Sequence, residues 1–281
     1  AFRAPFNGEF DADWLHDYAQ ASRLAFADRA QYVADPDFVH APAQDWQSLL
    51  DPAYLKLRAQ LMGPTSLKQV PAGTPLRAQK SVYAPMPEQA EFGTSHISVI
   101  DAYGNALAMT TTIENAFGAR QMVRGFLLNN ELTDFSFVPQ DTQGRLIANR
   151  VQANKRPRSS MSPTLVFDKR TGELLMSTGS PGGEMIIHFT AKTLLGVLHW
   201  GMTPQQAIDL PNFGALGDPM VVEEKRFSAT TLQSLRARGE QVREVALTSG
   251  LHTIVKLPKS DAPRHWIGGT DPRREGLVLG Q

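Results

Sequence analysis

The sequence changes character at residue 93, where a segment rich in proline and glycine gives way to alternating apolar and polar residues. Before that point, residues 11–38 carry apolar side chains at helical spacing, and Asp35-Pro36-Asp37 is expected to end this helix, because proline lacks an amide donor and restricts the residue before it. A second helix is predicted to begin at Asp51-Pro52. After it, strands are predicted at residues 97–101, 106–112, 125–130, 164–168, 173–177, 242–245 and 251–257. Further helices are predicted at residues 185–200, 204–210 and 228–238. Because strands and helices do not alternate regularly, we expect an α+β fold of stacked sheets covered by helices.

Residues 63–93 form the segment between these two parts. Apart from Gly93 at its end, the proline and glycine residues of this segment are Gly63, Pro64, Pro71, Gly73, Pro75, Pro85 and Pro87. Large apolar side chains are few before Phe92, so we expect an exposed and extended linker. A chain of 281 residues suffices for one large domain or two small ones, and the linker is compatible with either organisation.

The composition excludes several classes of protein. The 28 basic and 28 acidic side chains cancel, which argues against a nucleic-acid-binding protein. The absence of cysteine excludes disulfides, thiolate metal sites and a cysteine nucleophile. The seven histidines show no metal-ligand spacing, and Ser180 lacks the sequence context of a nucleophile elbow. No apolar run reaches the roughly 18 residues of a membrane-spanning helix. Because the chain begins at Ala1, we expect that a preceding segment was removed or not included.

The bond between Gly93 and Thr94 is a candidate reaction centre. A threonine at a chain N-terminus can act alone in catalysis, since its hydroxyl is the nucleophile and its α-amino group is the base. An α-amino pKa of about 7.7–8.0 suits this base near neutral pH. Inside the chain that amine belongs to a peptide bond, so the chemistry requires cleavage between Gly93 and Thr94. Glycine, which lacks Cβ, leaves its carbonyl group open to attack by the Thr94 hydroxyl. Taken alone, such a bond is more typical of an ordinary junction between a loop and a strand.

Downstream motifs give this junction a specific interpretation. The chain resembles the small subunit of γ-glutamyltranspeptidases at residues 94–101, 125–131, 134–135, 154–157, 159–164, 179–183 and 271–273. These motifs follow the order of the family over nearly all of residues 94–281. Residues 25–29 and 35–38 resemble the C-terminal end of the family's large subunit. The chain is therefore identified as a member of this family that lacks the N-terminal part of the large subunit.

The resemblance implies a four-layer αββα N-terminal-nucleophile hydrolase fold, present here in part. Residues 1–93 would be the end of the large subunit, with the processing linker at about 63–93, and residues 94–281 would be the small catalytic subunit. Both would remain associated as one layered domain after self-cleavage. The family passes an acyl group from a γ-glutamyl amide such as glutathione, through a nucleophile ester, to water or an amine. The resemblance implies no cofactor and no metal.

The same resemblance assigns roles to individual residues. Thr94 matches the nucleophile, and Thr112 matches a second threonine whose hydroxyl orients it. Gly182 and Gly183 match the pair whose backbone N–H groups form the oxyanion hole, where a glycine permits close approach.

Four further residues match the donor-binding site. Glu131 and Asp134 match the acidic pair that holds the donor's α-ammonium group, which would compensate two carboxylates in one pocket. Ser159 and Ser160 match serines that hydrogen-bond the donor's α-carboxylate. The family's arginine for that carboxylate is expected outside this chain.

Glu114 departs from the family pattern, because it stands where a donor-binding asparagine is expected. A further negative charge beside an incoming carboxylate is unfavourable. Three alternatives therefore stay open. The chain is a γ-glutamyl hydrolase or transferase, a related amidase for an oxamate-like or acyl-β-lactam amide, or an unprocessed and inactive form. The resemblance favours a periplasmic location, and a cytoplasmic one also stays open.

Overall fold

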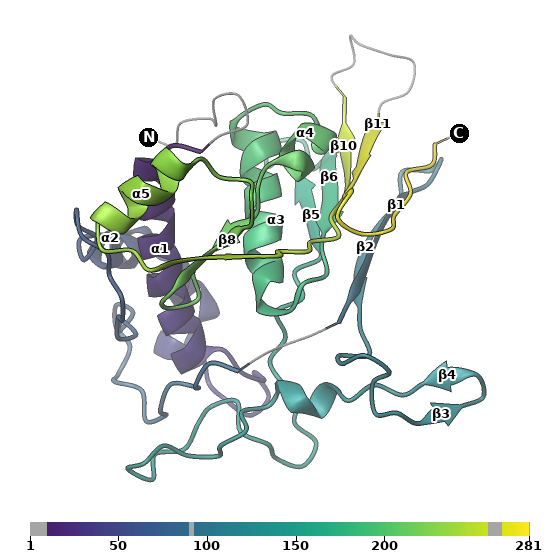
Figure 1. Ribbon diagram of the computed structural model, residues 1–281. Helices are drawn as coiled ribbons and strands as arrows, with labels where there is room; N and C mark the ends of the chain where they lie inside the picture. Colours follow the sequence, from purple (N-terminus) through teal and green to yellow (C-terminus); the bar gives the residue numbers. More distant parts are fainter. Residues whose placement is uncertain (1–9, 90–92, 258–265, 281) are drawn as a thin grey trace.

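The computed structural model describes residues 10–89, 93–257 and 266–280 (Figure 1). Glu91 and Phe92, at the end of the predicted linker, lie outside the described residues. The α-helices are α1 (Ala12–Tyr32), α2 (Pro52–Ala59), α3 (Ile186–Leu194), α4 (Pro204–Asp209) and α5 (Ala229–Ala237). Short 3-10 helices lie at Pro42–Gln44, Trp46–Leu50, Glu131–Asp134 and Gly183–Met185, and a π-helical turn lies at Leu195–His199. The strands are β1 (Ser95–Ile100), β2 (Ala106–Thr111), β3 (Met122–Val123), β4 (Phe126–Leu127), β5 (Thr164–Phe167), β6 (Leu174–Gly179), β7 (Phe213–Gly214), β8 (Met220–Glu223), β9 (Val242–Val245), β10 (His252–Lys256) and β11 (Trp266–Thr270).

Four of the five predicted helices, all except α3, begin at polar caps. The Asp11 carboxylate accepts a hydrogen bond from the Asp13 amide at 2.6 Å, and Thr203 forms a reciprocal capping box with Gln206. Helix α1 ends at Tyr32, shortly before the Asp35-Pro36-Asp37 segment that was expected to end it. A turn follows the helix, because the backbone carbonyl of Asp35 accepts from the amides of residues 38 and 39.

Three layers of the predicted four-layer fold are present in the described part of the chain. An antiparallel sheet with strand order β11-β10-β6-β5 forms the middle layer. Helices α3 and α4 pack on one face of this sheet, and the β1–β2 hairpin packs on the other, as Figure 1 shows. On the hairpin, Ile97, Val99, Leu107 and Met109 remain exposed. The stacking of helix, sheet and sheet positions the beginning of β1 beside the β6–α3 turn.

A second structural unit joins residues from both sides of residue 93. Strands β7, β8 and β9 form a small sheet, and α5 connects the parallel pair β8 and β9. Phe10 and Trp14 pack against Phe213 with ring centroids 4.7 and 5.5 Å away, and Trp200 lies 5.5 Å from Trp14. This hydrophobic cluster therefore combines residues from before and after the proposed cleavage site.

The sequence-based prediction is wrong for most of residues 125–130. Only Phe126–Leu127 forms a strand there, paired with Met122–Val123. Arg124 and Gly125 form the turn of this hairpin with φ values of 49° and 86°. Strands β8 and β11 were also not predicted, although the predicted strands at residues 242–245 and 251–257 are confirmed, with the second shortened.

The predicted linker is only partly exposed. Residues 63–89 contain no helix or extended strand, which agrees with their proline and glycine content. However, Ala84 and Met86 are buried, and Ala84 forms a parallel bridge with Ile147. The Met86 amide also donates to the carbonyl of Ala30 at 2.9 Å. Residues 84–86 of the linker are therefore packed against the fold, which corrects the expectation of a fully exposed segment.

Candidate active site

Gly93 and Thr94 lie immediately before β1. Gly93 has a φ of 58°, and a Cβ atom at this position would lie 2.1 Å from the carbonyl oxygen of Glu114. Glycine is therefore the residue that fits this backbone without displacing its neighbour. The Thr94 hydroxyl donates to the carbonyl oxygen of Gly93. The hydroxyl of the predicted nucleophile thus lies against the carbonyl group of the predicted cleavage site.

Thr112 reaches the same carbonyl from the opposite strand. The antiparallel register pairs Ser95 with Thr111, so Thr94 and Thr112 face each other at the end of the hairpin. The Thr112 hydroxyl also donates to the Gly93 carbonyl oxygen, and it accepts from the Glu114 amide at 2.8 Å. The accepted bond orients the hydroxyl, so that its hydrogen points to Gly93.

One pocket, with an empty volume of about 240 Å³, brings together eight of the predicted site residues. They are Thr94, Thr112, Glu114, Glu131, Asp134, Ser159, Ser160 and Gly183. Met161 and Ile186 complete its lining. Gly182 precedes Gly183 in the same turn, and Gly93 lines an adjoining opening beside Thr94 and Thr112. The residues come from segments far apart in the sequence, and the fold collects them at one end of the β1–β2 hairpin.

One wall of the pocket is acidic. Glu114 is buried, and its Oε2 atom accepts from the Asn130 side-chain amide at 2.5 Å. Asn130 directly precedes the 3-10 turn that carries Glu131 and Asp134. The backbone carbonyl of Asp134 accepts from the Asn149 side chain at 2.8 Å, which fixes this turn from behind. Asn130 and Asn149 were not predicted to belong to the site. Asn130 lies within one of the motifs noted in the sequence but was given no role there, and Asn149 lies outside those motifs.

The other wall carries the two serines. Ser159 is exposed, and its hydroxyl accepts from the Met161 amide at 3.1 Å. Ser160 is buried, and its hydroxyl accepts from the Arg29 guanidinium of α1 at 2.6 Å. Arg29 lies within one of the motifs noted in the sequence, but the sequence alone gave it no position relative to the serines.

Gly182 and Gly183 form the turn between β6 and α3. Their φ values are 137° and 58°, and a Cβ on Gly182 would lie 2.5 Å from the Phe189 ring. Gly183 begins the 3-10 turn that leads into α3. Backbone N–H groups at the start of a helical segment lack partners within it, so this turn is chemically suited to bind a negatively charged oxygen.

Residues 10–89, 93–257 and 266–280 contain no group of three His, Asp or Glu side chains that could hold a metal ion. Over the same residues, no helix has the length and hydrophobicity to cross a membrane.

Residues 5–281 match the family model described as gamma-glutamyltranspeptidase. The chain belongs to the γ-glutamyltranspeptidase family. It is 40% identical over 271 residues to the glutathione hydrolase proenzyme of Bacillus subtilis (strain 168), covering 93% of the chain and 44% of that protein. The chain therefore spans less than half the length of this relative.

Solved structures agree with this assignment. The chain resembles the T380A mutant of Helicobacter pylori gamma-glutamyltranspeptidase with a TM-score of 0.57 and 35% identity, over 64% of this chain and 99% of that one. It resembles cephalosporin acylase from Bacillus halodurans with a TM-score of 0.76 and 22% identity, over 98% of this chain and 46% of that one. The second similarity concerns the fold alone. The predicted N-terminal-nucleophile hydrolase fold is confirmed.

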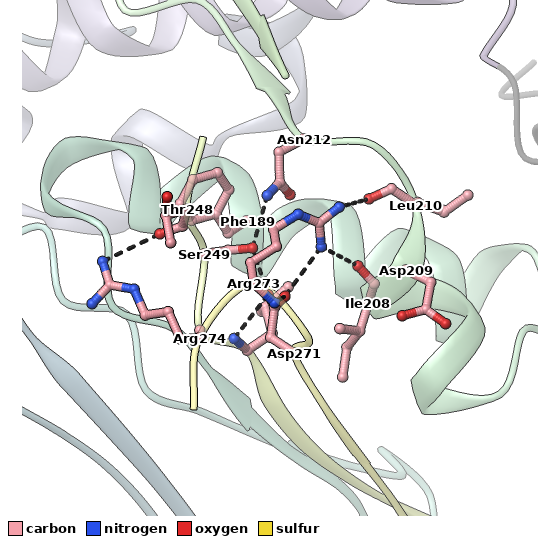
Figure 2. Close-up of polar contacts among 12 residues, drawn as sticks. Phe189, Ile208, Asp209, Leu210, Asn212, Thr248, Ser249, Asp271, Arg273 and Arg274 are labelled. Atoms are coloured by element: carbon pink, nitrogen blue, oxygen red, sulfur yellow. Dashed lines mark hydrogen bonds and ion pairs between the residues drawn. The ribbon is translucent and has the colours of Figure 1, made fainter. Parts of the chain in front are cut away.

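The C-terminal γ-glutamyltranspeptidase motif, Asp271-Pro272-Arg273, is held by a buried polar network (Figure 2). Arg273 donates to both carboxylate oxygens of Glu223 at 2.7 and 2.8 Å, and to the backbone carbonyls of residues 208 and 210. Asp271 accepts from the Ser249 hydroxyl at 2.5 Å. Burial alone would raise the pKa of Asp271, but hydrogen bonds from Ser249 and Arg273 outweigh it and lower the pKa.

The network also reaches Thr94, the predicted nucleophile, and the interior of α3. Arg274 donates to the backbone carbonyl of Thr94 at 3.5 Å and to that of Thr248 at 3.2 Å. Lys192 is buried and donates to the Asn212 side chain at 2.8 Å. Burial lowers the pKa of Lys192 to about 7. The sequence predicted a helix that is apolar on nearly all sides, and a buried lysine within it corrects that expectation.

Proposed function

We propose that the chain is the catalytic part of a self-processing N-terminal-threonine enzyme. It cleaves γ-glutamyl amides such as glutathione and passes the glutamyl group to water or to an amine. The observation that carries the proposal is the position of two hydroxyl groups, those of Thr94 and Thr112, on the carbonyl oxygen of Gly93. One hydroxyl is adjacent to the group it must attack, and the other can hydrogen-bond the oxygen that becomes negatively charged.

The first reaction is cleavage of the Gly93–Thr94 bond. The Thr94 oxygen attacks the Gly93 carbonyl carbon, and the carbonyl electron pair moves onto the oxygen that Thr112 contacts. The C–N bond then breaks, the hydroxyl proton passes to the departing nitrogen, and Gly93 remains as an ester of Thr94. Water hydrolyses this ester, which leaves a carboxylate on Gly93 and a free α-amino group on Thr94.

The second reaction is turnover of an amide. The free α-amino group accepts the proton of the Thr94 hydroxyl as its oxygen attacks the donor's γ-carbonyl carbon. The backbone N–H groups of Gly182 and Gly183 stabilise the resulting oxyanion, and one such donor typically supplies about 2.7–4 kcal/mol. The C–N bond of the donor breaks with transfer of the proton to the leaving amine. Water or an acceptor amine then attacks the acyl-Thr94 ester.

The two walls of the pocket support a donor with an amino-acid head group. Glu131 and Asp134 would hold the α-ammonium group, since several carboxylates in one pocket require a cation nearby. Ser159 and Ser160 would donate to the α-carboxylate. The contact between Glu114 and Asn130 places Glu114 with the acidic wall. We therefore propose that Glu114 adds to the recognition of the ammonium group.

Residues 1–93 and 94–281 are proposed to remain one layered domain after cleavage. One buried ion pair and one partly exposed ion pair between them support this proposal. Arg23 pairs with Glu240 at 2.7 Å, and Arg156 pairs with Asp35 at 2.7 Å. Such pairs do not depend on the peptide bond at residue 93.

The decisive experiment follows the protein containing this chain by intact mass, N-terminal sequencing and turnover of γ-glutamyl-p-nitroanilide. We expect a cleavage product that begins with Thr94, activity that appears with it, and loss of both in Thr94→Ala. A stable, uncleaved and inactive wild-type protein would support the alternative of an unprocessed form. Cleavage and activity in Thr94→Ala would refute the assignment of the nucleophile.

A related amidase for a non-glutamyl amide is the second candidate. The observation that favours it is Glu114 itself, which stands where the family resemblance leads us to expect an asparagine. Assay of the processed protein with plain short-chain, oxamate-like and acyl-β-lactam amides separates the two functions. Turnover of one of these without turnover of the γ-glutamyl donor would favour the second candidate.

A further inference from the structure

Arg29 joins α1 to two segments of the candidate active site. One of its terminal nitrogens donates to the Ser160 hydroxyl at 2.6 Å, and the other donates to Glu184 Oε1 at 3.1 Å. Ser160 lines the pocket, and Glu184 directly follows the Gly182-Gly183 turn. The Arg29 guanidinium also lies 5.6 Å from the centre of the Phe26 ring. These contacts hold the planar group in one orientation.

Glu184 contacts a second arginine in addition to Arg29. A second guanidinium, that of Arg158, lies 3.5 Å from the same Glu184 oxygen. Two arginines thus share one carboxylate at this wall. The side chains of Arg29, Glu184 and Arg158 are 12%, 10% and 4% exposed, so water and salt screen them weakly. Glu184 is therefore a largely buried carboxylate that helps to fix the Arg29 guanidinium beside Ser160.

The direction of the Arg29–Ser160 bond also matters. Because the serine oxygen accepts from a cation, its own O–H bond points away from Arg29 and becomes a stronger donor. A hydroxyl that is oriented and polarised in this way suits a negatively charged acceptor in the pocket. The acidic residues Glu114, Glu131 and Asp134 line the same pocket.

We infer that Arg29 is a positioning residue that makes the pocket selective for donors with a free α-carboxylate. It acts through the Ser160 hydroxyl, which it orients and polarises. This inference deepens the proposed function and rests on it. It also gives a role in substrate choice to a side chain from the part of the chain before the cleavage site.

The test compares two donors, γ-glutamyl-p-nitroanilide and its analogue in which the α-carboxylate is a neutral carboxamide. For the wild-type protein, kcat/KM should be higher with the carboxylate donor. In Arg29→Met, we expect that preference to fall by about tenfold or more, mainly through KM, which is the range for loss of one charge-assisted hydrogen bond. Arg29→Lys should give an intermediate ratio, because lysine retains the charge but not the planar fork.

Two further variants separate this role from a structural one. Ser160→Ala should lose a similar part of the preference, and adding Arg29→Met to it should have little further effect. Arg156→Met is the matched control. This arginine also joins residues before and after the cleavage site, through Asp35, but its side chain is 66% exposed and does not line the pocket. It should retain the wild-type ratio.

Each outcome has a distinct meaning. If Arg29→Met and Arg29→Lys lower kcat/KM equally for both donors, or leave the ratio unchanged, the inference is wrong while the proposed function stands. If Arg29→Met does not fold, the intermediate ratio of Arg29→Lys remains the criterion. A wild-type protein that is never cleaved or turns over neither donor contradicts the proposed function and the inference together.

Discussion

The Thr112 hydroxyl donates to the carbonyl oxygen of Gly93 while its oxygen accepts from the Glu114 amide at 2.8 Å. This arrangement aims a hydrogen-bond donor at the oxygen that gains negative charge during cleavage. Loss of one such donor typically slows a reaction by about 10²–10³-fold. We therefore expect Thr112→Val to slow the appearance of the Thr94 N-terminus by this factor, measured by intact mass over time.

Two controls accompany the Thr112 experiment. Thr112→Ser retains the hydroxyl and should cleave at close to the wild-type rate. Thr111→Val changes the exposed neighbouring position on the opposite face of β2 and should have little effect. Normal cleavage in Thr112→Val would show that this hydroxyl is not needed for processing.

Gly93→Ala should strongly slow cleavage while the protein remains folded. A methyl group at this position would approach the Glu114 carbonyl oxygen to 2.1 Å and force the reacting carbonyl out of place. Gly104→Ala is the matched control, because Gly104 has a φ of 88° but no atom within 4 Å of a new Cβ. Gly104→Ala has an unfavourable positive φ, as Gly93→Ala does, which costs about 1 kcal/mol, but its new methyl group has no steric clash. Equal cleavage rates in the two variants would mean that the close contact is unimportant.

Glu114→Gln should raise the KM for a γ-glutamyl donor about tenfold with little change in kcat. This is the range for loss of a charged hydrogen-bond partner of the substrate's ammonium group. Steady-state kinetics on the processed protein provide the measurement, and the exposed Glu224→Gln serves as the control. A lower KM in Glu114→Gln would instead indicate repulsion of the α-carboxylate, and would strengthen the case for a non-glutamyl amide.

Stability should fall as the pH decreases from about 6.5 to 4. Burial, with a smaller effect from His252, lowers the pKa of His96 from 6.5 to about 4, and burial lowers that of His188 to about 3. Between pH 6.5 and these lower pKa values, the unfolded chain binds more protons than the folded protein. The folded state therefore has the full stability associated with its neutral buried histidines above pH 6.5, and it loses that stability as the pH falls toward 4. For His96, which is 4% exposed, the full loss is about 3 kcal/mol.

Urea titrations at several pH values test this effect. His96→Asn should show a shallower loss of unfolding free energy between pH 6.5 and 4 than the wild-type protein. His40→Asn, at an exposed position, is the control for loss of a histidine. An unchanged slope in His96→Asn would contradict the proposed contribution of this residue.

Arg273→Met should destabilise the protein by about 3–5 kcal/mol, the range for removal of one partner of a buried ion pair. The substitution leaves Glu223 without its two closest charge-assisted bonds. Arg226→Met is the control, because Arg226 lies 3.8 Å from the same carboxylate but is 43% exposed. Chemical denaturation gives the free energy of unfolding of both variants. If both lose the same amount of stability, the burial of Arg273 does not determine how much its ion pair stabilises the protein.

The sequence predicted the components of the site better than their surroundings. Thr94, Thr112 and the Gly182-Gly183 turn were identified through their resemblance to motifs of the γ-glutamyltranspeptidase family, and Thr94, Thr112 and Gly183 line one pocket. The residues that contact these components could not be predicted from the sequence. Arg29 meets Ser160 across 131 positions, and Glu114 turns toward Asn130 because its backbone has a φ of 66°. Neither relationship leaves a local pattern, since both depend on how distant segments pack.

The aromatic cluster of Phe10, Trp14, Trp200 and Phe213 bears on the fate of a cleaved molecule. Once the bond after Gly93 is cut, two polypeptides share this core and neither can bury it alone. Separation of the two pieces and loss of their structure then become the same event. Before cleavage the melting temperature should be independent of protein concentration, whereas afterwards it should rise with concentration, as it does for an obligate heterodimer.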